Sequence, residues 1–404
     1  MAINVRLEKR TKSSWLIIID KGVDPVTKKR DREHRSIKTD DPEVAEAERL
    51  KIELDLLKGT YKPTSKVTLS EYIDRWFLTS AAKGLASKTI ERYKQCADLR
   101  IKPWIGHIRL RDLKRTELQA FYDQIIEVGH LDNLKPPDEG EEPKEKRAIG
   151  NDTVAHHHRF IRRVLNHAVF EDEILERNVA ARIKLPEAKP EFDPDEDTIK
   201  VFTSEEIATL EEKASATPYA QLIAVALRTG MRREELLGLR WDAVNFKDKT
   251  ILVKQALIYT KEKGYEIKPT KNKKRRLIEA TDEILNAFRA IARKQGPHRL
   301  RLGDNYRKDL NLMFCREDGF YSHPDTISSW FPDFCKAIDI TRLSFHCLRH
   351  THASHLLAAG EDLGFVSKRL GHSSLQITYQ TYTHFIPLEK REALQELEKR
   401  FKKK

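Results

Sequence analysis

The chain has 404 residues, with 75 Lys and Arg against 63 Asp and Glu, and a formal net charge of +12. This length exceeds the size at which one hydrophobic core usually stops growing, so we expect two or three domains. The excess of cations attracts polyanions such as nucleic acid, and also anionic membrane surfaces. Because no apolar run approaches the roughly 20 residues that span a bilayer and the N-terminus has no apolar signal-peptide core, we expect a cytoplasmic protein outside the membrane.

The first 60 residues have the pattern of a small sheet followed by a helix. Short β-like runs lie at residues 15–19 and 34–38, and a turn-forming stretch separates them. Asp41 before Pro42 predicts the start of a helix that ends at Gly59. Basic residues of this region are candidates for DNA contact because a two-stranded ribbon fits the major groove, although their charge alone slightly favours a solvated hairpin. They are Lys28, Lys29, Arg30, Arg32 and Arg35.

The next region is predicted to be entirely helical. A Pro-containing linker at residues 61–66 precedes Thr68 and Glu71, whose spacing is that of a capping box. Further helix starts fall near Ser87, Thr116 and Thr153, and apolar residues follow Thr153 at helical spacing. Residues 130–148 are rich in Pro, Glu, Lys and Gly, which predicts a mobile loop.

A third region follows a second linker at residues 184–199. Thr203 and Glu206 again have capping-box spacing, and the region is expected to be mostly helical. Runs typical of β-strands at residues 250–253 and 276–278 flank a basic turn. The predicted fold class is therefore multidomain and mainly α: a small sheet with a helix, an all-helical domain, and a mixed, mostly α domain with a small sheet.

Five motifs with the side chains of phosphoryl-transfer chemistry lie in this third region. A tyrosine phenol is a nucleophile that forms a reversible covalent bond to phosphate, and arginine forks stabilise the charge that gathers on the phosphate oxygens. A buried lysine can protonate a departing oxygen, and histidines can accept the phenolic proton. In chain order the motifs are the Thr229–Leu236 stretch around Arg232, Pro269-Thr270-Lys271, His346-Cys347-Leu348-Arg349-His350, Leu370-Gly371-His372 and Tyr382-Thr383-His384.

In this order the motifs resemble those of the tyrosine recombinases, or phage integrases, over residues 202–384. The resemblance implies that Arg232 and Arg349 clamp the scissile phosphate of double-stranded DNA. It implies that Lys271, on a β-hairpin, is the general acid. Tyr382 is implied to be the nucleophile that forms a 3′-phosphotyrosine.

The resemblance also assigns supporting roles. It implies that His346 accepts a proton, that His372 contacts the phosphate, and that Glu235 fixes the helix that carries Arg232. It implies a reaction without metal, ATP or another cofactor, because the bond energy stays in the phosphotyrosine.

In weaker form the resemblance covers the whole chain. Residues 1–62 are similar to an arm-type DNA-binding domain with a three-stranded sheet and one helix, residues 66–184 to a helical core-DNA-binding domain, and residues 200–404 to the catalytic domain. The resemblance implies an integrase of a phage or other mobile element that binds core and arm sites, forms a homotetramer on DNA and passes through a Holliday junction. An excisionase or a DNA-bending protein is an expected accessory partner.

Single residues have alternative readings. Arg232 alone is typical of a surface salt-bridge face, and the basic run allows Lys268 or Lys273 in place of Lys271. Tyr379 lies three residues before Tyr382 on the same helical face. His346 and His350, four residues apart, have the spacing of zinc ligands, but the motif supplies no third ligand. Cys96, Cys315, Cys335 and Cys347 are scattered, so we expect neither a disulfide nor a zinc knuckle.

Two other classes of function remain open. A type IB topoisomerase shares the chemistry and relaxes supercoils as a monomer, and a DNA-binding regulator keeps the fold without cutting. Apolar residues on one side of the segment 388–401 predict a terminal helix that docks on a neighbouring protomer or packs on its own domain.

Overall fold

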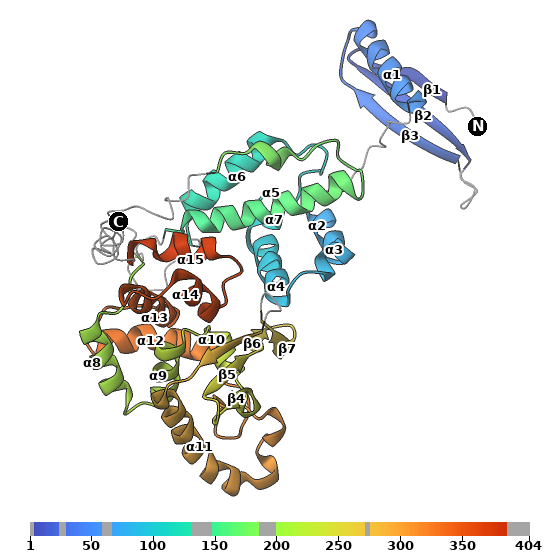
Figure 1. The fold of residues 1–404 in the computed structure, drawn as a ribbon. Coiled ribbons are helices and arrows are strands. Elements are labelled where there is room, and N and C mark those ends of the chain that lie inside the picture. The colour runs from blue at the N-terminus through green and yellow to red at the C-terminus, as the bar shows by residue number, and fades with distance from the viewer. Residues whose placement is uncertain are drawn as a thin grey trace, which may run out of the picture. The chain divides into compact units, whose positions relative to one another are not determined.

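The computed structural model describes residues 4–23, 30–58, 67–130, 148–185, 199–270 and 275–385. The chain divides into two compact units, Met1–Lys189 and Pro190–Lys404, which are described separately (Figure 1). Within the described ranges no helix is both long and apolar enough to cross a bilayer.

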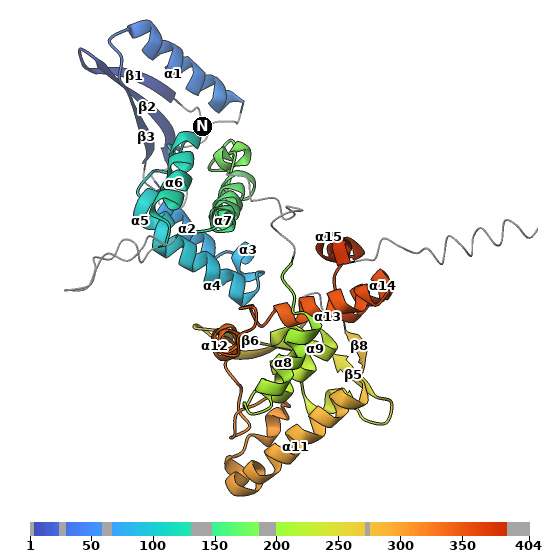
Figure 2. The same ribbon diagram turned by 90° about the vertical axis from the view of Figure 1, so that its left-hand side faces the viewer.

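The N-terminal part of the first unit is a three-stranded antiparallel sheet with one helix. Its strands run in the order β1-β2-β3, and Ile17 of the central strand pairs with Leu7 and Arg35. Asp41 caps the helix by accepting a hydrogen bond of 2.8 Å from the backbone N–H of Glu43. The helix lies against the sheet (Figure 2), as the sequence predicts. The elements are β1 (Asn4–Thr11), β2 (Ser14–Val23), β3 (Arg30–Ile37) and α1 (Pro42–Leu57).

The rest of the first unit is helical, which confirms the sequence prediction for the described residues. Both halves of the capping box between Thr68 and Glu71 are present. The core centres on Trp76, whose ring lies 5.7 Å from that of Phe160 and 6.4 Å from that of Tyr93. Most of the predicted loop at residues 130–148 lies outside the described residues. The elements are α2 (Leu69–Phe77), α3 (Ser80–Lys83), α4 (Ser87–Cys96), the π-turn η1 (Ala97–Ile101), α5 (Lys102–Ile105), α6 (Arg115–Val128), α7 (Asn151–Phe170) and the 3₁₀ turn η3 (Val179–Arg182).

The second unit is mostly helical and contains two small sheets. The helices are α8 (Ser204–Ala214), α9 (Ala220–Thr229), α10 (Arg233–Leu237), α11 (Asp282–Leu302), α12 (Pro324–Ala337), α13 (Cys347–Ala358), α14 (Leu363–Leu370) and α15 (Leu375–Tyr382), with 3₁₀ turns at η4 (Trp241–Ala243), η5 (Gly303–Asn305), η6 (Lys308–Leu310) and η7 (Thr383–Phe385). Thr203 and Glu206 form the predicted capping box at the start of α8.

The strands of this unit are arranged differently from the prediction that two strands flank one basic turn. The two predicted runs do not flank one turn, because they pair with each other as β5 and β8, with Ile251 opposite Ile278. A hairpin whose two strands were not predicted from the residues lies between them in the chain, and its second strand ends just before the basic run, where the resemblance implied a β-hairpin at Lys271. The sheets are β4 (Val244–Asn245), β5 (Thr250–Val253) and β8 (Arg276–Glu279), and the hairpin β6 (Gln255–Thr260) with β7 (Gly264–Pro269).

Two hydrophobic clusters hold the second unit together. The larger surrounds Phe202, Phe288 and Phe331. The smaller joins α13, α14 and α15 through buried residues that include Leu370 and Tyr382. Tyr382 is therefore part of the packing of its own unit.

We expect Trp76→Ala to lower the free energy of unfolding of the helical part by about 3 to 5 kcal/mol, because it removes a buried indole from an aromatic cluster. Leu78→Ala is the matched control, since Leu78 is exposed, and it should change the value by less than about 0.5 kcal/mol. Urea unfolding followed by circular dichroism measures both. Equal losses in the two variants would contradict the assignment of Trp76 to the core.

Candidate active site

Arg232 is placed by a turn that glycine makes possible. Gly230 ends α9 with a φ of +61°, and a Cβ atom at this position would lie 2.6 Å from Cδ2 of His352. The chain then turns into α10, and Arg232 occupies its N-cap position. The backbone N–H of Arg232 donates to Oε2 of Glu235 at 2.9 Å, and its Nη1 donates to Oε1 at 3.0 Å. Both ends of Arg232 are thus fixed by one carboxylate.

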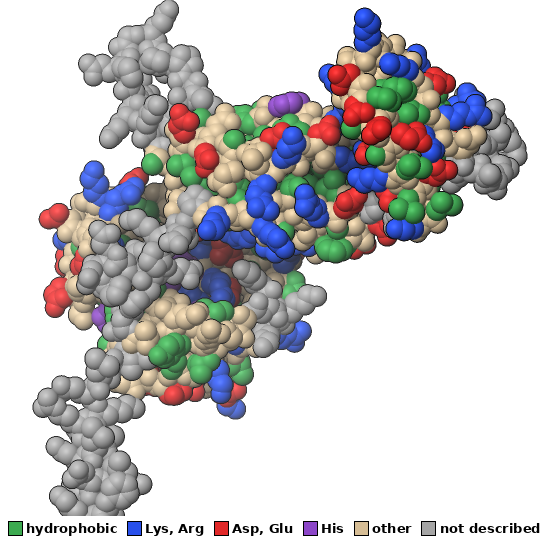
Figure 3. Space-filling view, turned by 90° about the horizontal axis from the view of Figure 1, so that it is seen from above, with side chains coloured by type: hydrophobic (Ala, Val, Ile, Leu, Met, Phe, Trp, Pro, Cys, Tyr) green, Lys and Arg blue, Asp and Glu red, His purple; other side chains and the backbone are tan. Residues whose placement is uncertain are grey.

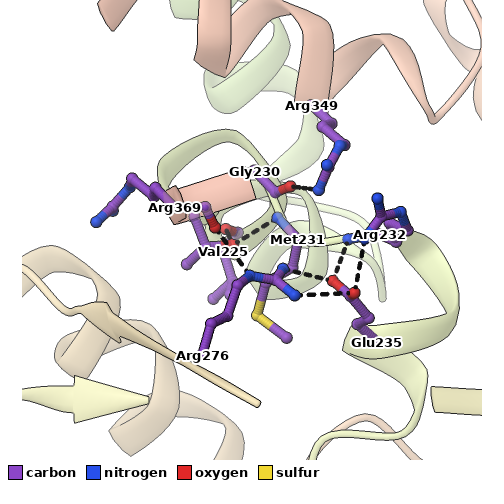
Figure 4. Close-up of polar contacts among 9 residues, drawn as sticks. Val225, Gly230, Met231, Arg232, Glu235, Arg276, Arg349 and Arg369 are labelled. Atoms are coloured by element: carbon purple, nitrogen blue, oxygen red, sulfur yellow. Dashed lines mark hydrogen bonds and ion pairs between the residues drawn. The ribbon is translucent and has the colours of Figure 1, made fainter. Parts of the chain in front are cut away.

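Glu235 also binds a second arginine that the sequence reading missed. Nη2 and Nη1 of Arg276 donate to its two oxygens at 2.6 and 3.0 Å, and Nε of Arg276 donates to the carbonyl of Arg369 at 2.8 Å (Figure 4). Burial opposes ionisation of Glu235, but hydrogen bonds and charge from Arg276 and Arg232 together lower its pKa below the ordinary value. The structural role implied for Glu235 therefore has a physical basis, and Arg276 shares it.

Arg349 comes from α13 and lies in the same cluster with 3% of its surface exposed. Its Nη1 donates to the carbonyl of Gly230 at 2.8 Å (Figure 4), while its Nη2 is buried without a hydrogen-bond partner within the described chain. Burial, followed by the charge of Arg232, lowers the pKa of Arg349 to about 9. A buried guanidinium N–H that has no acceptor within the described chain, next to other cations, is suited to bind an anion.

Tyr382, at the end of α15, lies beside this cluster. Its ring is 1% exposed, and its hydroxyl lies 2.7 Å from Nδ1 of His350. Burial raises the pKa of Tyr382 to about 12, while Arg349 and Arg232 act to lower it. Tyr379, the rival nucleophile, is 55% exposed on the same helix.

Histidines surround the Tyr382 ring. The ring of His372 stacks nearly parallel to it at a centroid distance of 6.4 Å, and Nδ1 of His372 is hydrogen-bonded to Oγ1 of Thr378 at 2.7 Å. His346 lies one helical turn before His350 and is exposed to solvent, and the two rings meet edge to face with their centroids 4.9 Å apart. Loss of hydration beside the surrounding protein first, and the charge of Arg349 second, lower the pKa of His346. The residue at the Tyr382 hydroxyl is therefore His350, which the sequence reading considered only as a zinc ligand.

The predicted general acid and its alternatives are only partly described by the structure. Lys271 and the alternative Lys273 lie outside the described residues, and Lys268 forms an ion pair of 3.0 Å with Glu266 on β7. Among the residues that the structure describes, no group of three His, Cys, Asp or Glu side chains is arranged to hold a metal ion.

The predicted basic residues of the N-terminal sheet fall into two groups. Lys28 and Lys29 lie outside the described residues, and for Arg30 only its place in β3 is described. Arg32 pairs with Asp20 at 3.0 Å and Arg35 with Glu48 at 3.2 Å, and both remain partly exposed. Acidic neighbours in the same domain thus offset part of this positive charge.

Cationic side chains also gather in the helical part of the first unit. A cavity of about 970 Å³ lies between the start of α6 and the end of α7. Six cationic side chains and the carboxylate of Glu176 line it. Besides Arg111, the cations are five that form no ion pair within the described ranges: Lys114, Arg115, Arg162, Arg177 and Arg182. Lys and Arg side chains also gather over the helices in Figure 3, and Arg159 and Arg163 are exposed on α7.

Comparison with known proteins places these features in one class. The phage integrase family model matches residues 200–387, and the model of the phage integrase N-terminal SAM-like domain matches residues 68–126. A XerC-like tyrosine recombinase of Caldanaerobacter subterraneus subsp. tengcongensis is 26% identical over 352 residues, which cover 82% of this chain and 83% of that protein.

Solved structures agree on the fold. The Tn1549 transposon integrase in complex with a circular intermediate DNA matches 82% of this chain and 99% of its own with a TM-score of 0.63 and 16% identity. The structure of a lambda integrase tetramer bound to a Holliday junction matches 95% of this chain and 96% of its own chain, with a TM-score of 0.54 and 17% identity.

The fold and the site define a tyrosine-type site-specific recombinase, an enzyme that acts on DNA. The chain belongs to the phage integrase family, as its motifs indicated.

We expect Arg276→Met to destabilise the second unit by about 3 to 5 kcal/mol, because it breaks a buried ion pair and leaves Glu235 with one partner. Arg275→Met is the matched control, since Arg275 is the exposed neighbour in the chain. Thermal unfolding of both variants measures the difference. If the two variants unfold at the same temperature, Arg276 does not hold Glu235.

Proposed function

We propose that Tyr382 is the nucleophile of a mobile-element or phage integrase that cuts and rejoins double-stranded DNA. The observation that carries the proposal is the buried Tyr382 hydroxyl beside an arginine cluster in which Arg349 keeps an N–H without an acceptor. A phosphodiester group supplies the missing acceptor. The forked donors of Arg232 and Arg349 suit its two non-bridging oxygens.

The reaction exchanges one phosphoester bond for another. The Tyr382 oxygen forms a bond to phosphorus, the bond from phosphorus to the 5′ oxygen breaks, and Lys271 protonates that leaving oxygen. The product is a 3′-phosphotyrosine and a free 5′ hydroxyl. His346 and His372 are the further members of the site, and they face the phosphate. No ATP is needed, because resealing uses the energy of the phosphotyrosine bond.

We assign a separate role to each of the three regions of the chain. Residues 1–62 bind arm-type DNA sites, residues 66–184 bind the core site, and residues 200–404 catalyse. The match to the SAM-like domain and the unpaired cations of the helical part support the core-binding role. Duplex DNA neutralises such side chains through its phosphates.

The proposed assembly is a tetramer, with two protomers on each core site and strand exchange through a Holliday junction. The lambda integrase tetramer on such a junction supports it by likeness of fold. An excisionase or a DNA-bending protein would set the direction of the reaction. The segment 388–401, predicted to dock on a neighbour, lies outside the described residues.

A suicide-substrate assay tests the nucleophile. A nicked duplex carrying the joined ends of the element is incubated with the full chain in EDTA, and a covalent adduct is sought on a denaturing gel. We expect an adduct with the parent and with Tyr379→Phe, and none with Tyr382→Phe, because only the phenol of Tyr382 lies at the arginine cluster. An adduct that survives Tyr382→Phe but not Tyr379→Phe would contradict the assignment.

The same assay separates the alternative functions. DNA binding without an adduct from any of the three proteins would favour a regulator that keeps the fold without cutting. Cleavage by a monomer that needs no paired specific sites would favour a type IB topoisomerase.

We expect the double variant Arg159→Ala/Arg163→Ala to bind core-site DNA with a weaker salt dependence. If each arginine neutralises one phosphate, the slope of log affinity against log salt falls by about 0.9 per residue. Electrophoretic mobility shifts at several salt concentrations measure it. Lys213→Ala is the control, because Lys213 already pairs with Glu212 at 2.9 Å, and its slope should equal that of the parent. If the double variant keeps the salt slope of the parent, Arg159 and Arg163 do not contact the DNA phosphates.

A further inference from the structure

The polar contact that the Tyr382 hydroxyl makes within the described chain is with His350. The distance from the hydroxyl oxygen to Nδ1 is 2.7 Å, within the range of a strong hydrogen bond. The ring centroids lie 5.7 Å apart and are tilted, so the contact is made through the polar atoms. The resemblance assigned the phenolic proton to His346, one turn earlier on the same helix.

The surroundings of His350 keep its imidazole neutral, so that Nδ1 can accept this hydrogen bond. Burial, then the neighbouring His346 and Arg349, lower the pKa of His350 to about 4, so the imidazole is neutral near pH 7. With its proton on Nε2, a neutral imidazole presents a lone pair at Nδ1. In this tautomer the Tyr382 hydroxyl donates and His350 accepts, which is the arrangement of a nucleophile and its base.

Neither of the other histidines has this geometry. His346 meets the ring of His350 and has no polar contact with Tyr382 among the described residues. His372 lies parallel to the Tyr382 ring, and its Nδ1 is engaged by Thr378. The charged and titratable groups whose fields reach Tyr382 and His350 are Arg232, Arg349, His346 and Cys347, with His372 stacked on the ring.

We propose that His350, and not His346, is the catalytic base that accepts the phenolic proton of Tyr382. This inference rests on the proposed function. As the Tyr382 oxygen bonds to phosphorus, its O–H bond breaks and the proton passes to Nδ1 of His350. The bond from phosphorus to the 5′ oxygen breaks, and that oxygen takes its proton from Lys271. In resealing, the imidazolium of His350 returns the proton to the departing phenolate.

The proton stays on Tyr382 until DNA arrives. A phenol whose pKa is near 12 does not give its proton to an imidazole whose pKa is near 4. The bound phosphate adds negative charge among the arginines, which favours the imidazolium of His350. His350 thus holds the nucleophile in place in the free protein and activates it when the phosphate is bound.

The test compares His350→Gln with His346→Gln in the full chain. Single-turnover adduct formation is measured on the nicked duplex with the joined element ends, from about pH 6 to about pH 9, and DNA affinity is measured in parallel. We expect His350→Gln to bind DNA like the parent and to form adduct about 10² to 10³ times more slowly. Its rate should rise about tenfold per pH unit, because only the phenolate then attacks, while the parent and His346→Gln stay nearly flat.

A second measurement separates this role from a purely structural one. Replacing Tyr382 by 3,5-difluorotyrosine lowers the phenol pKa and should restore most of the rate lost in His350→Gln. A flat pH profile in His350→Gln, a rate within about threefold of the parent, or a pH-dependent rate in His346→Gln instead would each overturn the inference. In all of these outcomes the adduct of the parent, absent in Tyr382→Phe, leaves the proposed function intact. Failure of the parent to form an adduct on the joined ends overturns both.

Discussion

The active site depends on one buried carboxylate. Glu235 lies between Arg232 and Arg276 and binds both through short hydrogen bonds, with 3% of its surface exposed. A lone carboxylate at this depth would take up a proton, and lone guanidiniums would repel each other. Because the carboxylate is shared, Arg232 is fixed to the start of α10 and the β8 strand is tied to the same point. Elements far apart in the chain therefore meet at Glu235.

The cluster remains unbalanced after this sharing. Arg232, Arg276 and Arg349 contribute three positive charges against one carboxylate, and Arg349 keeps a buried N–H without an acceptor. Such an excess costs stability in the free protein. In the proposed function this excess of positive charge serves to receive an anion, because the donors are already oriented when the phosphate arrives. The same excess would then explain both the instability of the free site and its affinity for a phosphodiester.

Local signals in the sequence predicted much of this structure. The capping boxes at Thr68 and Thr203 mark true helix starts, and the order of motifs named Arg232, Arg349 and Tyr382, which the fold brings together. The roles of these residues stay a prediction until they are tested. The two strands of the hairpin β6–β7 were not predicted from the residues because these half-buried strands lack a clear alternation. Arg276 stands in a basic run, where nothing in the sequence marks it as a residue that turns inward.

The choice between two histidines shows where sequence reasoning stops. His346 and His350 lie four residues apart on one helical face, so spacing treats them alike. What separates them is the return of α15 against α13, which places the Tyr382 hydroxyl beside the second histidine. That return is set by apolar packing, through buried residues such as Leu370 and Val366. The hydrophobic contacts of the last helices thus decide which histidine meets the Tyr382 hydroxyl, and in the proposed mechanism the chemistry at the phosphate depends on that packing.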